Sequence, residues 1–206
     1  MKFLYRLGSD QTGASAAEFA LVLPIFLIFL LGTIDVGRYA WAVSEAEKAT
    51  QIGARWAVAT DLIPTGLATY SFAIDGGIPQ GTVVDNTAFP GVHCEATGGA
   101  VTCTCNAACD FDPAPGTEGQ AAFASIVNRM RTVYPRLSAD DVVVDYEHSG
   151  LGFSGDPNGA DVSPFVRVSL RNQRYPLFMM LGNDVALPNF TYALTMEDGA
   201  GTYANY

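Results

Sequence analysis

The stretch that decides the fold is residues 13–34, which read Gly-Ala-Ser-Ala-Ala-Glu-Phe-Ala-Leu-Val-Leu-Pro-Ile-Phe-Leu-Ile-Phe-Leu-Leu-Gly-Thr-Ile. From Phe19 to Ile34 no side chain is charged, and Glu18 stands at the edge of this run. A membrane-spanning helix needs about 20 predominantly apolar residues, and the run reaches that length once residues 14–18 are added. An ionisable group near bilayer depth costs a few kcal/mol and marks a functional site. The stretch therefore predicts a membrane helix in which Glu18 has a task.

The helical pattern continues beyond this run. Apolar and small side chains recur at spacings of three and four through residues 36–60, and charged residues occupy the other face. No proline follows Pro24 until Pro64, and Pro24 itself suggests a local kink. One helix from about residue 14 to residue 60, ~70 Å long, is expected. Its first half faces lipid, and its second half lies against a globular domain with Trp56 in the core.

Length and composition limit the remaining possibilities. The chain has 206 residues, a net charge of -10 and 49% hydrophobic residues, so it has room for one membrane segment and one folded domain. The acidic balance and the scattered basic residues argue against a nucleic-acid partner, which requires clustered Lys and Arg. The high apolar content excludes a disordered chain.

The C-terminal part of the chain predicts an α+β domain. Residues 61–115 show little periodicity, with short strands expected at 68–74 and 82–84. A helix is expected from Thr117, capped with the help of Gln120, to near Pro135. Three segments then alternate apolar and polar residues, the pattern of half-buried strands: 142–147, 166–171 and 190–196. The link between the first two is too short for a crossover helix, so an antiparallel sheet is expected.

Four cysteines lie close together in a polar stretch, at positions 94, 103, 105 and 109. Their even number predicts two disulfides and an oxidising compartment outside the cytoplasm. Since a Cys103–Cys105 bridge would close too short a loop, Cys94 is expected to pair with Cys103 or Cys105, and the remaining one with Cys109. A zinc site with His93 is the rival, but the spacing lacks paired Cys-x2-Cys knuckles.

Other motifs predict no chemistry. Residues 150–155 spell a dinucleotide-binding glycine loop but precede turn residues instead of a helix. His93 and His148 have no nucleophile arranged around them, and Asp110 with Asp112 are too few ligands for calcium. We expect no catalytic residue, no cofactor and no metal site.

The amino terminus resembles a known processing signal. Lys2 and Arg6 precede Gly13, small residues follow it, and Glu18 is the fifth residue after it. This arrangement resembles the prepilin-peptidase site of type IV pilin-like proteins, and the pair Glu18-Phe19 resembles that of the tight adherence (Tad) branch. Segments 137–146 and 166–170 look like the C-terminal half of TadE-like proteins.

The resemblance implies a minor pseudopilin of the inner membrane of a Gram-negative bacterium, taking part in assembly of a Tad pilus for surface attachment. A prepilin peptidase would cut between Gly13 and Ala14. The other implied partners are Tad pilins and pseudopilins, the inner-membrane assembly platform and the lipid bilayer; entry into the extracellular pilus is left open. The implied parts are a leader (1–13), a transmembrane helix (14–35), its amphipathic continuation (36–60) and a periplasmic domain (61–206) with a Cys-rich loop (92–115).

Elementary chemistry agrees with that implication. A cut after Gly13 turns Ala14 into a free α-amino group with a pKa near 8, hence mostly cationic. Glu18 of one subunit could then pair with Ala14 of its neighbour. Two alternatives stay open: an exported binding protein whose signal sequence ends in Ala40-Trp41-Ala42, and a binding domain with an uncleaved membrane anchor.

Overall fold

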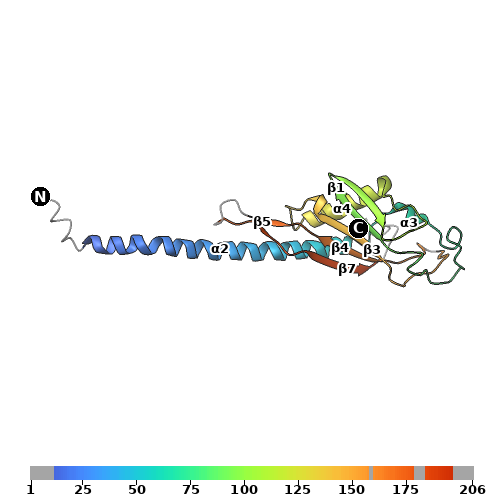
Figure 1. The fold of residues 1–206 in the computed structure, drawn as a ribbon, viewed down its shortest axis with the longest axis horizontal. Helices are drawn as coiled ribbons and strands as arrows, with labels where there is room; N and C mark the ends of the chain where they lie inside the picture. Colours follow the sequence, from blue (N-terminus) through green and yellow to red (C-terminus); the bar gives the residue numbers. More distant parts are fainter. Residues whose placement is uncertain (1–11, 158–159, 179–183, 197–206) are drawn as a thin grey trace, which may run out of the picture. The chain divides into compact units, whose positions relative to one another are not determined.

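The computed structural model describes residues 12–157, 160–178 and 184–196. These residues form two compact units. The first comprises the described parts of Met1–Ala42 and Arg174–Val185, and the second those of Val43–Gln173 and Ala186–Tyr206. The α+β layout expected from the sequence is confirmed: a long apolar helix is followed by a domain with a five-stranded antiparallel sheet (Figure 1).

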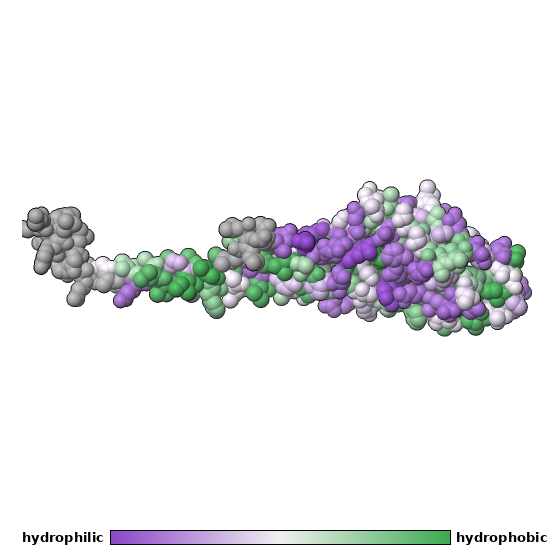
Figure 2. Space-filling view, viewed as in Figure 1, coloured by the Kyte–Doolittle hydropathy of each residue, from purple (hydrophilic) through white to green (hydrophobic). Residues whose placement is uncertain are grey.

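A single helix, α2 (Thr12–Ala57), contains 46 residues and continues through Pro24. Its apolar segment, residues 19–34, exposes large side chains: Leu21 is 75% exposed, Ile25 71% and Phe29 70%. These residues form the hydrophobic band along α2 in Figure 2. By length and composition, this helix qualifies to cross a membrane. The observed bounds lie within three residues of the expected ones.

The last part of α2, residues 43–57, is built differently, and we call it the packed segment. Its inward side chains are small and fully buried: Ala46, Ala49, Ala54 and Ala57. A Cβ atom on Gly53 would lie 2.7 Å from Met130 Sδ and 3.3 Å from Val168 Cγ1. The absence of bulk on this face therefore lets the helix backbone approach the sheet and α4 (Gly116–Arg131) closely.

The main sheet has the strand order β2-β1-β3-β4-β7, and every pair of neighbours is antiparallel. Side chains on one face, such as Val144, Val168 and Tyr146, are fully buried against the helices. The other face carries the polar residues. The strands are β1 (Val92–Thr97), β2 (Ala100–Cys105), β3 (Val142–Glu147), β4 (Phe165–Leu170) and β7 (Phe190–Thr195).

The cysteine-rich region was expected to be a loop, but residues 92–105 form a β-hairpin. Val92, Cys94 and Ala96 point inward, and Gly98 and Gly99 form its two-residue turn, both with positive φ (59° and 85°). Such a turn favours glycine because other residues are strained there. On the outer edge, the Gln120 amide accepts the N–H of Val101 at 3.2 Å and donates to its carbonyl at 2.9 Å.

Several local expectations were wrong. Residues 68–74 are not a strand, because α3 (Thr65–Thr69) is followed by a turn; residues 82–84 do not form one either. Thr117 does not cap α4, whose N-cap residue is Pro115 without a side-chain bond. Gln120 instead bonds to Val101, as described above. Trp56 is only half-buried rather than in the core. Gln120 and Trp56 differ from expectation because each side chain bonds to a residue of another element, Val101 and Ser125 respectively.

The region between α2 and the hairpin is held by buried polar groups. The Asp161 carboxylate is 5% exposed and accepts the backbone N–H groups of Phe72 at 2.7 Å and Asp156 at 3.0 Å. Tyr146 is fully buried, and its hydroxyl accepts the N–H of Ile63 at 3.1 Å. Burial raises the pKa of Tyr146, so the phenol stays neutral. These bonds order a segment with little regular structure.

Candidate functional site

The expected processing and assembly residues lie at the beginning of α2. Gly13 is in the first turn, and no described heavy atom would come within 4 Å of a Cβ added to it. Glu18 is exposed. Ala14 and Glu18 are four residues apart in α2, about one helical turn. Both positions therefore lie at the end of the helix that precedes the apolar segment.

At the other end of the apolar segment lies a cluster that sequence reasoning missed. Asp35, the first charged residue after the run, is only 5% exposed, and its Oδ1 accepts the backbone N–H of Phe178 at 3.0 Å. Arg38 Nη1 lies 4.0 Å from the same oxygen, and the Arg38 guanidinium lies 5.7 Å from the centre of the Tyr175 ring. The Tyr175 ring also contacts Tyr39 edge-on, with centroids 6.4 Å apart.

This cluster connects α2 to a short hairpin made of β5 (Arg174–Pro176) and β6 (Asp184–Ala186). Figure 1 shows β5 beside α2. The strands contain three residues each, below the length at which alternation is recognisable. The available signal was Asp35 itself, because a carboxylate that borders an apolar helix needs a partner.

The four cysteines form two disulfides, Cys94–Cys103 and Cys105–Cys109. This is one of the two pairings that the spacing left open. Cys94 and Cys103 are register partners on β1 and β2, with Cα atoms 4.1 Å apart, as at a closely spaced position of an antiparallel pair. The second disulfide fixes the chain just after β2 ends. Together they hold the edge of the sheet and its outgoing loop.

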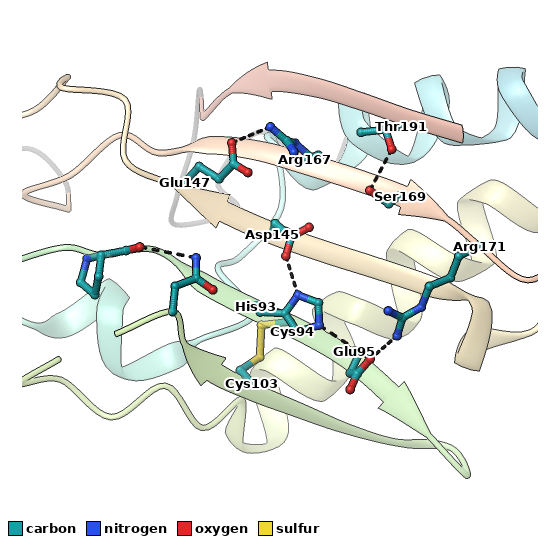
Figure 3. A network of polar contacts seen from close by, with 12 residues as sticks. His93, Cys94, Glu95, Cys103, Asp145, Glu147, Arg167, Ser169, Arg171 and Thr191 are labelled. Atoms are coloured by element: carbon teal, nitrogen blue, oxygen red, sulfur yellow. Dashed lines mark hydrogen bonds and ion pairs between the residues drawn. A yellow bond between two sulfur atoms is a disulfide. The ribbon is translucent and has the colours of Figure 1, made fainter. Parts of the chain in front are cut away.

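The polar face of the sheet carries a network of ion pairs (Figure 3). His93 Nδ1 lies 2.6 Å from Asp145 Oδ1, and Arg167 Nη2 donates to Glu147 Oε2 at 2.8 Å. Arg171 donates to Glu95, and this bond holds the Glu95 pKa below its usual range. All of these side chains are part-exposed. The first two pairs join neighbouring strands and support their register, and the Arg171–Glu95 pair joins the residue after β4 to β1.

None of these groups forms an evident reactive centre. Within the described residues, no set of three His, Cys, Asp or Glu is placed to hold a metal ion. His148 Nε2 lies 2.8 Å from the carbonyl of Val84, far along the chain, and Asp112 accepts the N–H of Ala114 in a local turn. These contacts are structural.

Comparison with known proteins adds one finding. Residues 13–55 match the family model described as TadE-like protein. No curated protein and no solved structure matches the chain. The match covers most of α2 and stops before the sheet, so the likeness of residues 137–146 and 166–170 to that family stays a prediction. Over the segment from Gly13 to Arg55, this chain is similar to TadE-like proteins.

Proposed function

We propose that this chain is a minor pseudopilin that takes part in assembly of a Tad-type pilus for surface attachment. It is held in the inner membrane by the apolar segment of α2, and its disulfide-bonded domain lies in the periplasm. A prepilin peptidase cuts it between Gly13 and Ala14. Its action is assembly with other pilins, pseudopilins and the inner-membrane platform, and it carries out no catalysis.

The observation that carries this proposal is the layout of α2. The family match begins at Gly13, Glu18 follows at the edge of exposed apolar side chains, and the helix is unbroken. A plain anchor has no use for a carboxylate at that edge, because burying a charge without a partner is unfavourable. An opposite charge on a neighbouring subunit removes this cost.

Proteolysis supplies the opposite charge. Before the cut, the nitrogen of Ala14 is an uncharged amide; afterwards it is an α-amine with a pKa near 8 and is mostly cationic at neutral pH. Glu18 of one subunit then pairs with the amine of Ala14 in the next subunit. The exposed small side chains of Ser15, Ala16 and Ala17 allow two helices to approach closely there.

The disulfides support a periplasmic domain. Such bonds persist in oxidising compartments and are rare in the cytoplasm. The pairs Cys94–Cys103 and Cys105–Cys109 account for all four cysteines of the chain. With the domain outside, the amino terminus faces the cytoplasm, which is where the implied peptidase acts.

The intact mass of the protein purified from its native membrane tests the processing step. We expect a new N-terminus at Ala14. A terminus at Val43 would support the exported alternative, and one at Met1 the uncleaved anchor; either contradicts the proposal. Against the exported form, α2 passes through Ala42 without interruption, and Ala42 is 3% exposed.

Substituting Gly13 sharpens this test. Gly13→Leu has open space around it, so the helix should form while cleavage fails and pili are lost. Gly37→Leu is the matched control, because a side chain there also meets no described atom within 4 Å. Normal piliation together with a normal mature mass in Gly13→Leu would refute the proposal.

The assembly charge is tested separately. Glu18→Gln keeps the size of the side chain and removes the charge, so cleavage should proceed while pilus number falls by about tenfold or more, the effect of losing one buried charged pair. Glu47→Gln, at an exposed position of the packed segment, is the control and should leave piliation unchanged.

A further inference from the structure

The β5–β6 hairpin gives the first unit a feature that neither cleavage nor helix pairing uses. Its described residues up to Val185 belong to the same compact unit as the apolar segment of α2. Tyr175 is 6% exposed against Tyr39 and Arg38, whereas Phe178, three residues later, is 65% exposed. A large aromatic side chain is thus held outward next to a helix that itself exposes apolar side chains.

The contacts fix the direction of the hairpin. Tyr175 lies beside residues 38 and 39 of α2, and the N–H of Phe178 is bonded to Asp35. The chain therefore runs antiparallel to α2, toward Ile34, where the charge-free run ends. Phe178 consequently reaches the level of the helix at which apolar side chains begin, and Ile34 there is 49% exposed.

The composition at this level is typical of a membrane interface. Tyr175 contacts Tyr39 and Arg38, and Trp41, three residues after Arg38 in α2, is 69% exposed. Tryptophan and tyrosine are enriched where the hydrocarbon meets the headgroups, and basic side chains reach from there to water. The exposed ring of Phe178 extends this apolar surface from the helix onto the hairpin.

We propose that the β5–β6 hairpin makes a second contact with the lipid bilayer, by inserting Phe178 into the interfacial region of the periplasmic leaflet. Asp35 is the positioning residue, because its carboxylate holds the backbone of Phe178 at that level. The occupant is lipid rather than a second copy of the chain, since the surface is continuous with the segment of α2 that is expected to span the membrane. This inference rests on the membrane location in the proposed function.

Depth-dependent fluorescence quenching tests the contact. The full chain is placed in vesicles of phosphatidylethanolamine and phosphatidylglycerol, with Trp41 and Trp56 replaced by Phe and one new tryptophan introduced by Phe178→Trp. Lipid brominated near the headgroup should quench this probe by about twofold, since interfacial side chains lie about 5–10 Å deep. Aqueous acrylamide should quench it little.

Two further probes separate the possible failures. Phe26→Trp, within the apolar segment, should be quenched by lipid brominated deep in the acyl chains. Ile74→Trp, which replaces a side chain 82% exposed in the second unit, should be quenched by acrylamide alone. If Phe26→Trp is not quenched by lipid, the membrane location in the proposed function fails. If Phe26→Trp is quenched and Phe178→Trp responds only to acrylamide, the hairpin proposal alone is overturned.

Protection of the Phe178→Trp probe from both quenchers would also overturn the proposal, because it would mean that protein, such as a second copy, covers the ring.

The role of Asp35 is tested in the same background. Asp35→Asn retains an oxygen that accepts the Phe178 N–H and should preserve lipid quenching, whereas Asp35→Leu should reduce it by half or more. Equal quenching in the two variants would remove Asp35 from the proposal. Lipid quenching of the Phe26→Trp probe should not change with either substitution of Asp35.

Discussion

The apolar segment and the packed segment belong to one helix, yet the first exposes its large side chains and the second buries one face in the domain. In residues 19–34 the large side chains point outward, and Phe19, Leu21 and Ile25 are each at least 65% exposed. In residues 43–57 the inward side chains are alanines that are fully buried. Charge separates the two stretches, because residues 43–57 carry Glu45, Glu47, Lys48 and Arg55 whereas residues 19–34 carry no charged side chain. Side-chain size also separates them: large apolar side chains face outward in residues 19–34, and small ones let the buried face of residues 43–57 pack closely on the sheet.

The largest expected effect comes from a charge placed in the apolar segment. Ile28→Arg should shift the membrane-inserted fraction by on the order of 100-fold, because an arginine at the centre of a spanning helix costs about 2.5–3.5 kcal/mol. Carbonate extraction of membranes measures the retained protein. Glu47→Arg in the packed segment should leave retention unchanged; equal loss in both variants would abolish the distinction between the segments.

A larger side chain should have the reverse pattern: it should destabilise the packed segment and leave the apolar segment unaffected. Ala46→Leu, at a fully buried position, should lower the free energy of unfolding by about 1–3 kcal/mol, since an extra side chain cannot fit between helix and sheet. Ala20→Leu makes the same change at an exposed position and should not alter unfolding. Thermal unfolding of the detergent-solubilised full chain compares the two, and a similar Tm for both variants would contradict close packing.

Each of the two compact units contains one tryptophan of α2. Trp56 Nε1 donates to Ser125 Oγ at 3.1 Å, and Arg129 lies 5.0 Å from its ring centre, so Trp56→Phe should cost about 1 kcal/mol of unfolding free energy. Trp41, which is 69% exposed, should tolerate the same change without loss. Chemical denaturation provides the measurement, and a larger effect at Trp41 would reverse the assignment.

The smallest effect is a pH dependence of the domain alone. Arg171 lowers the Glu95 pKa in the folded state, so this pair stabilises the fold above the unfolded pKa, and the contribution is lost as pH falls through the lower folded value. Both side chains are about one-third exposed, so the loss between about pH 5 and pH 3 should stay under about 1 kcal/mol. Arg171→Met should make the free energy of unfolding depend less on pH in this range. Neither the pH change nor the substitution should alter membrane retention.

The regular patterns in the sequence predicted the framework well. The packed segment of α2, helix α4 and strands β3, β4 and β7 follow from periodicity, because one face of each is packed and the other is not, and the first half of α2 follows from its apolar run. Their antiparallel order follows from a short connection. What the pattern could not supply was the partner of each side chain: Gln120 was assigned to a helix cap and instead bonds to β2.

The β1–β2 hairpin could have been predicted and was missed for a specific reason. The close cysteines suggested an irregular loop held by disulfides. However, Cys94 and Cys103 occupy inward positions of an alternating pattern on either side of Gly98-Gly99, and this pattern predicts a hairpin. The cluster at Asp35 was harder to predict, because it joins residues 143 positions apart and rests on a backbone N–H. Neither the length of β5 nor its composition indicates that contact.

The bonds between Gln120 and Val101 have a consequence for crowding. An edge strand offers its N–H and C=O groups to any other strand, and proteins held at high density in a membrane patch or a fibre meet such edges constantly. Here one amide side chain occupies both groups of Val101, the second residue of β2. Pairing of β2 with a strand of another molecule is therefore blocked at this position.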